Sequence, residues 1–128
     1  MASMKWLFLG TAILAMAAPL AAHHSYAATY FENKTATIEG NVVKVTFRNP
    51  HSFITVEAPD AHGELARWAV EWASGQALSG HGITHETLKV ADHVVVIGNP
   101  SRDAADYRMR MLSITRPKDG WRWSGTLQ

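Results

Sequence analysis

Beyond residue 34, apolar and polar residues alternate along most of the chain, which is the pattern of half-buried β-strands. The alternation predicts strands at residues 35–47, 52–58, 65–72, 94–97 and 107–115. Glycines punctuate the segment between the third and fourth strands. That segment therefore has room only for a short helix around residues 76–79 and a turn near residues 84–88.

The first predicted strand changes its inward face partway along. Apolar residues alternate on one side as far as Val42, and from Val43 onward they alternate on the other. Such a slip indicates a β-bulge or a sharp coil, and Gly40 would ease the bend. We therefore expect a long, strongly bent first strand.

The order of three strands, a short helical connection and two more strands predicts an all-β fold. It is typical of the OB-fold, a partly open Greek-key barrel of about five strands. A small immunoglobulin-like sandwich is the alternative, although it requires more strands. We expect one OB-like domain at residues 23–128, with an extended arm at residues 23–34. The Trp-Arg-Trp tail at residues 121–123 would add an edge strand or cap the barrel.

Residues 1–22 have the pattern of a cleavable secretion signal. Lys5 is the only charge before an apolar run, Pro19 breaks that run, and small residues precede a cut after Ala22. The run is shorter than the roughly 20 apolar residues of a membrane span. An uncleaved N-terminal anchor is the alternative. The pattern predicts a periplasmic or secreted protein that meets the membrane only during export.

Charge and cysteine content exclude several classes of function. Of the 12 Lys and Arg residues, Lys5 lies in the signal, and the other 11 balance 11 Asp and Glu. A neutral domain is not expected to bind nucleic acid, because that affinity comes mostly from neutralising phosphates. The chain has no cysteine, which excludes thiol redox chemistry and cysteine metal sites.

The end of the signal is the strongest candidate for chemistry. Cleavage after Ala22 would make His23 the first residue, and its free amine and ring nitrogen would chelate one metal ion. His51, in the Asn-Pro-His turn, would supply a third nitrogen if the arm folds back beside it. Nitrogen ligands in a planar T or square suit Cu(II). Cleavage one residue earlier would put His24 third, which also binds Cu(II), through the amine, two backbone amides and the ring.

Each of these histidines also has a simpler interpretation. His23 and His24 would be a polar, solvated start to the arm, and His51 would only fix its turn through a loop carbonyl. Glu71, on the third strand, would orient a ligating histidine from outside the metal's ligand set, or be an ordinary exposed carboxylate. Met109 and Met111 share one face of the last strand, where two thioethers would suit Cu(I). Inward-facing methionines, however, usually fill a core.

The second hypothesis is an interaction module without a metal. The barrel face would bind a protein, a glycan or a small ligand through aromatic anchors, with Trp68 and Trp72 as candidates beside the tail tryptophans. An enzyme is the weakest hypothesis. The sequence contains no nucleophile elbow, no phosphate loop and no suggestively paired carboxylates, so we assign no catalytic residue.

The chain also resembles a family of small exported bacterial proteins catalogued as a domain of unknown function. The resemblance rests on His-His-Ser-Tyr at residues 23–26, Ile-Glu-Gly-Asn-Val at 38–42, Asn-Pro-His at 49–51, Trp-Ala-Val-Glu at 68–71 and Leu-Lys-Val-Ala-Asp-His-Val at 88–94. It covers nearly the whole chain after the signal, apart from the tryptophan tail. The resemblance implies export and a single domain, and it supplies no activity.

Overall fold

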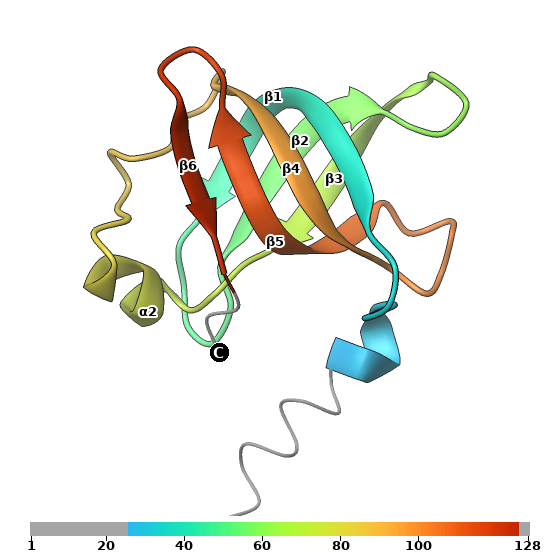
Figure 1. Cartoon of the computed structure of the whole chain (residues 1–128), viewed down its shortest axis with the longest axis horizontal. Helices are drawn as coiled ribbons and strands as arrows, with labels where there is room; N and C mark the ends of the chain where they lie inside the picture. Colours follow the sequence, from blue (N-terminus) through green and yellow to red (C-terminus); the bar gives the residue numbers. More distant parts are fainter. Residues whose placement is uncertain (1–25, 126–128) are drawn as a thin grey trace, which may run out of the picture.

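The computed structural model describes residues 26–125, and these form a small β-barrel with an additional strand (Figure 1). The elements are β1 (Ala36–Thr46), β2 (Phe53–Pro59), β3 (Leu65–Glu71), α2 (Gly75–Gly80), β4 (His93–Pro100), β5 (Arg108–Arg116) and β6 (Trp121–Ser124). Each of the five predicted strands is present, and the predicted short helix lies between the third and fourth.

Strand pairing closes the barrel. The sheet runs in the order β3-β2-β1-β4-β5-β6, with antiparallel neighbours throughout. A parallel pairing of β3 with β5, from Ala69 opposite Arg108 to Glu71 opposite Arg110, joins the two ends of the five-stranded part. The predicted OB-like barrel is therefore confirmed. β6 lies beyond this closed ring, beside the second half of β5 (Figure 1).

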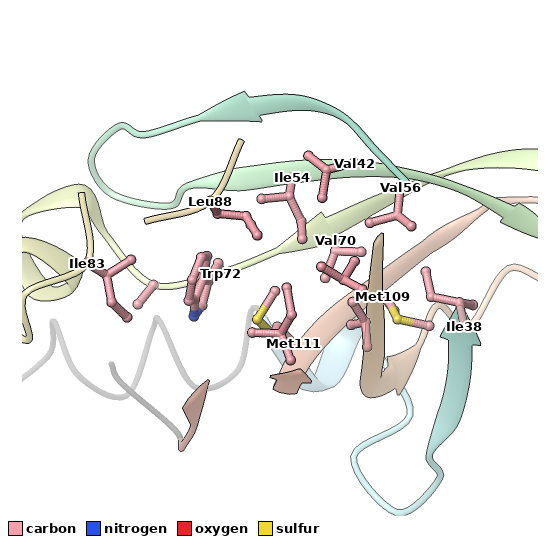
Figure 2. Close-up of a cluster of buried hydrophobic side chains, with 14 of the residues drawn as sticks. Ile38, Val42, Ile54, Val56, Val70, Trp72, Ile83, Leu88, Met109 and Met111 are labelled. Carbon is pink, nitrogen blue, oxygen red and sulfur yellow. The ribbon is translucent and has the colours of Figure 1, made fainter. Parts of the chain in front are cut away.

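The inward-facing side chains of the strands fill the interior as a single apolar core (Figure 2). Val42, Val56, Val70 and Met109 are completely buried, each from a different strand. Alternation explains this packing, because every second residue of a strand points to the same face. Burying one such aliphatic side chain stabilises the fold by roughly 1.5–3 kcal/mol.

The expected bend in β1 is a β-bulge. The register between β1 and β2 shifts between Val42 and Lys44, so the strand changes its inward face there. Gly40 lies just before the bulge, where a Cβ atom would stand 2.0 Å from the carbonyl oxygen of Glu57. Only glycine allows β1 and β2 to approach this closely. β1 can therefore bend at the bulge and remain paired with β2 on both sides of it.

Two elements differ from the sequence-based expectation. β4 continues through Pro100 instead of ending at Ile97, because a second register shift at Gly98 keeps it paired with β5. Residues 26–29, expected to be extended, form one helical turn closed by a bond from the Tyr30 amide to the Tyr26 carbonyl. The turn places Tyr26 and Tyr30 against the barrel, where both are buried.

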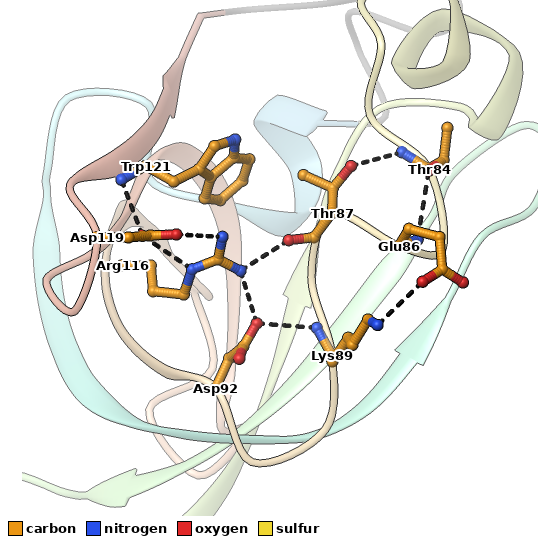
Figure 3. A network of polar contacts seen from close by, with 8 residues as sticks. All are labelled: Thr84, Glu86, Thr87, Lys89, Asp92, Arg116, Asp119 and Trp121. Atoms are coloured by element: carbon orange, nitrogen blue, oxygen red, sulfur yellow. Dashed lines mark hydrogen bonds and ion pairs between the residues drawn. The ribbon is translucent and has the colours of Figure 1, made fainter.

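The connection from α2 to β4 is held to the barrel by Arg116 of β5 (Figure 3). Its guanidinium donates to the Thr87 carbonyl at 2.7 Å and to the Asp92 carboxylate at 2.8 Å. It also forms a two-pronged ion pair with Asp119 in the turn before β6. These hydrogen bonds lower the pKa of Asp119 to about 2. Arg116, Asp92 and Asp119 all have hydrogen-bond partners within this cluster, and we therefore assign the cluster a structural role.

The tail forms an edge strand, one of the two alternatives expected for it. Trp121 and Trp123 lie on β6 at the barrel edge, and the ring of Trp123 packs edge-on against Trp72 at 5.3 Å between centroids. No helix within residues 26–125 is long and apolar enough to cross a bilayer.

Candidate functional site

A buried carboxylate, that of Glu71, is the centre of the candidate site. Its side chain points away from the barrel interior at the end of β3, yet the residue is only 7% exposed. Oε2 accepts a hydrogen bond from the Tyr30 hydroxyl and another, at 2.7 Å, from Nη2 of Arg108. Oε1 lies 3.5 Å from Nδ1 of His51. A charged group buried in this way requires such partners.

The parallel seam between β3 and β5 brings Glu71 and Arg108 together. Arg108 opens β5 opposite Ala69, two residues before Glu71 on β3, so both side chains project from the same outer face. Nε of Arg108 also donates to the Tyr30 hydroxyl at 2.7 Å. Burial and the bond to Glu71 raise the pKa of Tyr30 above its ordinary value, although Arg108 opposes the shift. Tyr30 is therefore a neutral donor at physiological pH.

Residues 26–31 are held against the barrel by the start of the loop after β4. The amide of Phe31 donates to the Pro100 carbonyl, and Tyr30 forms an isolated β-bridge with Ser101. Arg102 donates from its backbone amide to the Thr29 carbonyl and from Nε to the Ala27 carbonyl. These hydrogen bonds to the backbone hold the segment that carries Tyr26 in place, in addition to the contacts of the Tyr26 ring itself.

The loop between β1 and β2 presents His51, and a set of local bonds gives this loop its shape. Ser52 bonds through its hydroxyl to both the amide and the carbonyl of Arg48. The same loop caps the start of α2, where the Gln76 amide donates to the Asn49 side chain at 3.1 Å. The Asn-Pro-His turn is thus packed between β3 and the helix, and His51 faces Glu71.

Tyr26 and His51 are in direct contact. The Tyr26 hydroxyl lies 2.6 Å from Nδ1 of His51, and the two rings meet edge-on at 5.3 Å between centroids. Burial and the nearby Glu71 raise the pKa of Tyr26, so its hydroxyl stays protonated near neutral pH. The guanidinium carbon of Arg110 lies 3.8 Å from the centroid of the Tyr26 ring and packs over the face of that ring.

The second ring nitrogen of His51, Nε2, is the candidate ligand atom. No residue in the range 26–125 hydrogen-bonds to it. In the tautomer in which Nδ1 donates to the Tyr26 hydroxyl, with the Glu71 carboxylate 3.5 Å away, Nε2 carries a lone pair. This is the state in which a neutral imidazole binds a metal ion or accepts a proton.

The predicted site residues fall into three groups. His51 and Glu71, 20 positions apart in the sequence, are neighbours in the structure. His23 and His24 lie outside the described residues. Within the described part of the chain, no group of three or more His, Asp and Glu side chains is placed to hold a metal ion.

The other predicted residues lie in or near the core. Trp72, Met109 and Met111 are almost completely buried inside the barrel, where a partner on the surface would not touch them (Figure 2). Trp68 is half-buried and packs edge-on against Tyr107, with its indole N–H donating to the Ala58 carbonyl. The methionines thus fill the core, which was their simpler interpretation.

Sequence reasoning missed Tyr26 and Tyr30 as site residues. Their spacing of four positions is a helical one, and it places both rings on the same side of the turn that carries them. Arg108 lies on the last predicted strand, where an arginine side chain is ordinarily solvated. Its role depends on the parallel pairing of β3 with β5, which no local pattern reveals.

Comparison with known proteins agrees with the motifs described above. No curated protein matches the chain. A model of a family of unknown function, DUF6152, matches residues 12–109, from within the apolar run to the start of β5. The tryptophan tail lies beyond the match. Because the match covers more than three quarters of the sequence, the chain belongs to this family of unknown function, as the resemblance predicted.

Proposed function

We propose that this protein is exported, loses residues 1–22, and binds one Cu(II) ion between its new N-terminus and His51. The ligands would be the amine and ring nitrogen of His23 together with Nε2 of His51, with His24 close by. The observation that carries the proposal is the 2.6 Å contact between Tyr26 and His51.

That contact limits how far the preceding residues lie from His51. Consecutive Cα atoms are 3.8 Å apart, so the Cα of His24 is within about 8 Å of that of Tyr26, and the Cα of His23 within about 11 Å. These lengths would allow the first residue of the processed protein to reach the Nε2 side of the His51 ring, as the proposal requires. The amine and the ring nitrogen of His23 would then bind the same ion as Nε2 of His51, and the ring of His24 would be the fourth candidate.

The surroundings of His51 also favour a metal ligand. Nδ1 lies beside Tyr26 and Glu71, which orient the ring and would hold a proton on Nδ1, on the side away from the metal. A carboxylate behind a ligating imidazole raises its basicity and fixes its tautomer. Glu71 itself is neutralised by Arg108, so it would act through His51 and not as a ligand.

The test uses protein exported with its own signal and purified from the periplasm. Its intact mass locates the cut, and Cu(II) titration followed by electron paramagnetic resonance compares the native protein with His51→Ala. The control is His62→Ala, which removes an exposed histidine from the β2–β3 loop. We expect one ion per chain, a spectrum that changes only in His51→Ala, and loss of tight binding when a methionine precedes His23.

Two results would oppose the proposal. A cut after Ala21 with identical spectra in both variants would assign the copper to the amine, the backbone amides and His24, without His51. Equal binding by the protein with an added methionine would mean that the N-terminal amine is not a ligand. The first result would leave His51 as a residue that shapes its loop, and the second would remove the N-terminal amine that the proposed site requires.

A further inference from the structure

A pocket opens beside the His51 loop, and Tyr26 is not among the residues that line it. Its volume is about 330 Å³, near the lower end of the range for small-molecule sites. It is lined by Arg48, Asn49, Pro50, His51, Phe53, Glu71 and Arg108. The pocket therefore joins the loop to the outer face of β2, β3 and β5, and it shares His51 and Glu71 with the candidate copper site.

Two guanidinium groups face the aromatic ring of Phe53 in this pocket. The central carbon of Arg48 lies 5.2 Å from the ring centroid, and that of Arg108 lies 5.4 Å from it. Arg108 uses Nε and Nη2 on Tyr30 and Glu71, which leaves Nη1 without a partner among residues 26–125. The pocket thus combines the cationic donors of two arginines with the apolar surface of the Phe53 ring.

The charges in the pocket do not balance. Glu71 compensates Arg108, but within residues 26–125 no carboxylate pairs with Arg48, whose Nε donates only to the His51 carbonyl at 3.1 Å. One positive charge remains, held on a planar group whose N–H donors match a carboxylate in two-pronged geometry. Glu71 lies in the same wall and would repel a second negative charge.

We propose that this pocket binds a small organic monocarboxylate. The carboxylate would bind Arg48 and the free Nη1 of Arg108, and its apolar body would lie against Phe53 and Pro50. The single excess charge and the carboxylate of Glu71 select against phosphate and other multiply charged anions. This site is separate from the copper proposal, since it needs neither the N-terminal amine nor Nε2 of His51.

The experiment is an NMR titration of the metal-free, EDTA-treated protein, with backbone amide shifts as the readout. The probes are 3-phenylpropionate, acetate and inorganic phosphate. We expect saturable binding of 3-phenylpropionate with shifts around Phe53, weaker binding of acetate, and no saturation with phosphate. Using metal-free protein separates this result from the copper test, so failure of one leaves the other intact.

Two variants and one control make the assignment specific. Arg48→Gln should weaken the binding of 3-phenylpropionate by about tenfold, because it removes a charge-assisted pair. Arg67→Gln makes the same charge change further along β3, on an exposed arginine paired with Glu57, and should leave binding within about twofold. Phe53→Leu should weaken 3-phenylpropionate while leaving acetate unchanged.

Three outcomes would overturn the proposal. One is the absence of saturable binding by any of the probes to the folded native protein. Another is equal loss of affinity in Arg48→Gln and Arg67→Gln, which would indicate only general electrostatic attraction. The third is phosphate binding as tight as that of 3-phenylpropionate, which would make the pocket a general anion site.

Discussion

Nη2 of Arg108 lies 2.7 Å from the buried carboxylate of Glu71, and this ion pair crosses the seam where β3 and β5 close the barrel. The seam has only three paired positions, from Ala69 to Glu71 on β3. Tyr30 completes the cluster by donating to Glu71 and accepting from Arg108. This cluster, of which Glu71 also lies beside His51, therefore helps to hold the ring of strands together.

We predict that Glu71→Gln destabilises the protein by about 2–3 kcal/mol, because it leaves a partly buried Arg108 without its counter-charge. Urea denaturation at neutral pH measures the change. Glu57→Gln is the matched control, since its pair with Arg67 is exposed, and we expect it to change stability by less than about 1 kcal/mol. Equal effects of the two changes would mean that the seam does not depend on this ion pair.

The raised pKa of Tyr30 predicts a loss of stability in alkali. Because the folded state holds the phenolic proton more tightly than the unfolded chain does, its contribution is complete below the ordinary pKa of 10.0. It is lost progressively as pH rises above that value, toward the folded-state pKa. Tyr26 and Tyr107 have raised pKa values as well and act in the same direction.

Tyr30→Phe tests this contribution. The variant should be less stable at neutral pH by about 1–3 kcal/mol, since Glu71 and Arg108 each lose a buried hydrogen-bond partner. As pH rises above about 10, its urea midpoint should fall less steeply than that of the native protein. Parallel curves for the two proteins would show that Tyr30 does not titrate differently on folding.

We predict that Gly40→Ala costs about 3 kcal/mol or more, because its Cβ would overlap the backbone of Glu57 and force β1 away from β2. Gly80→Ala at the end of α2 is the control. A Cβ there meets nothing within 4 Å, so stability should stay the same or rise by up to about 1 kcal/mol. Thermal unfolding of both variants distinguishes a close strand contact from a general glycine effect.

If copper binds as proposed, Tyr26→Phe should weaken it without unfolding the protein. The phenyl ring keeps its packing against His51 and Arg110, whereas the hydroxyl beside Nδ1 is lost. Removing a group that orients a ligating histidine typically lowers metal affinity by about 10-fold or more. Competition with a Cu(II) chelator measures the affinity. An unchanged affinity in this variant would show that Tyr26 does not orient the ligand.

Local pattern was enough to predict the strands and the bulge of β1. The alternation of side chains is a property of each strand alone, and the change of face between Val42 and Val43 is visible in the residues themselves. The helix between the third and fourth strands was likewise predictable, because glycines at both ends limit its length. From these elements and their order, the OB-like barrel followed.

Only the tertiary structure decided where the site lies. Glu71 reads locally as an exposed strand carboxylate, and its burial comes from Tyr30 and Arg108, which are 41 and 37 positions away. The contact of Tyr26 with His51 likewise depends on bonds to the loop after β4. Closing a barrel brings together residues whose separation in sequence carries no periodic signal, so no local pattern predicts their contacts.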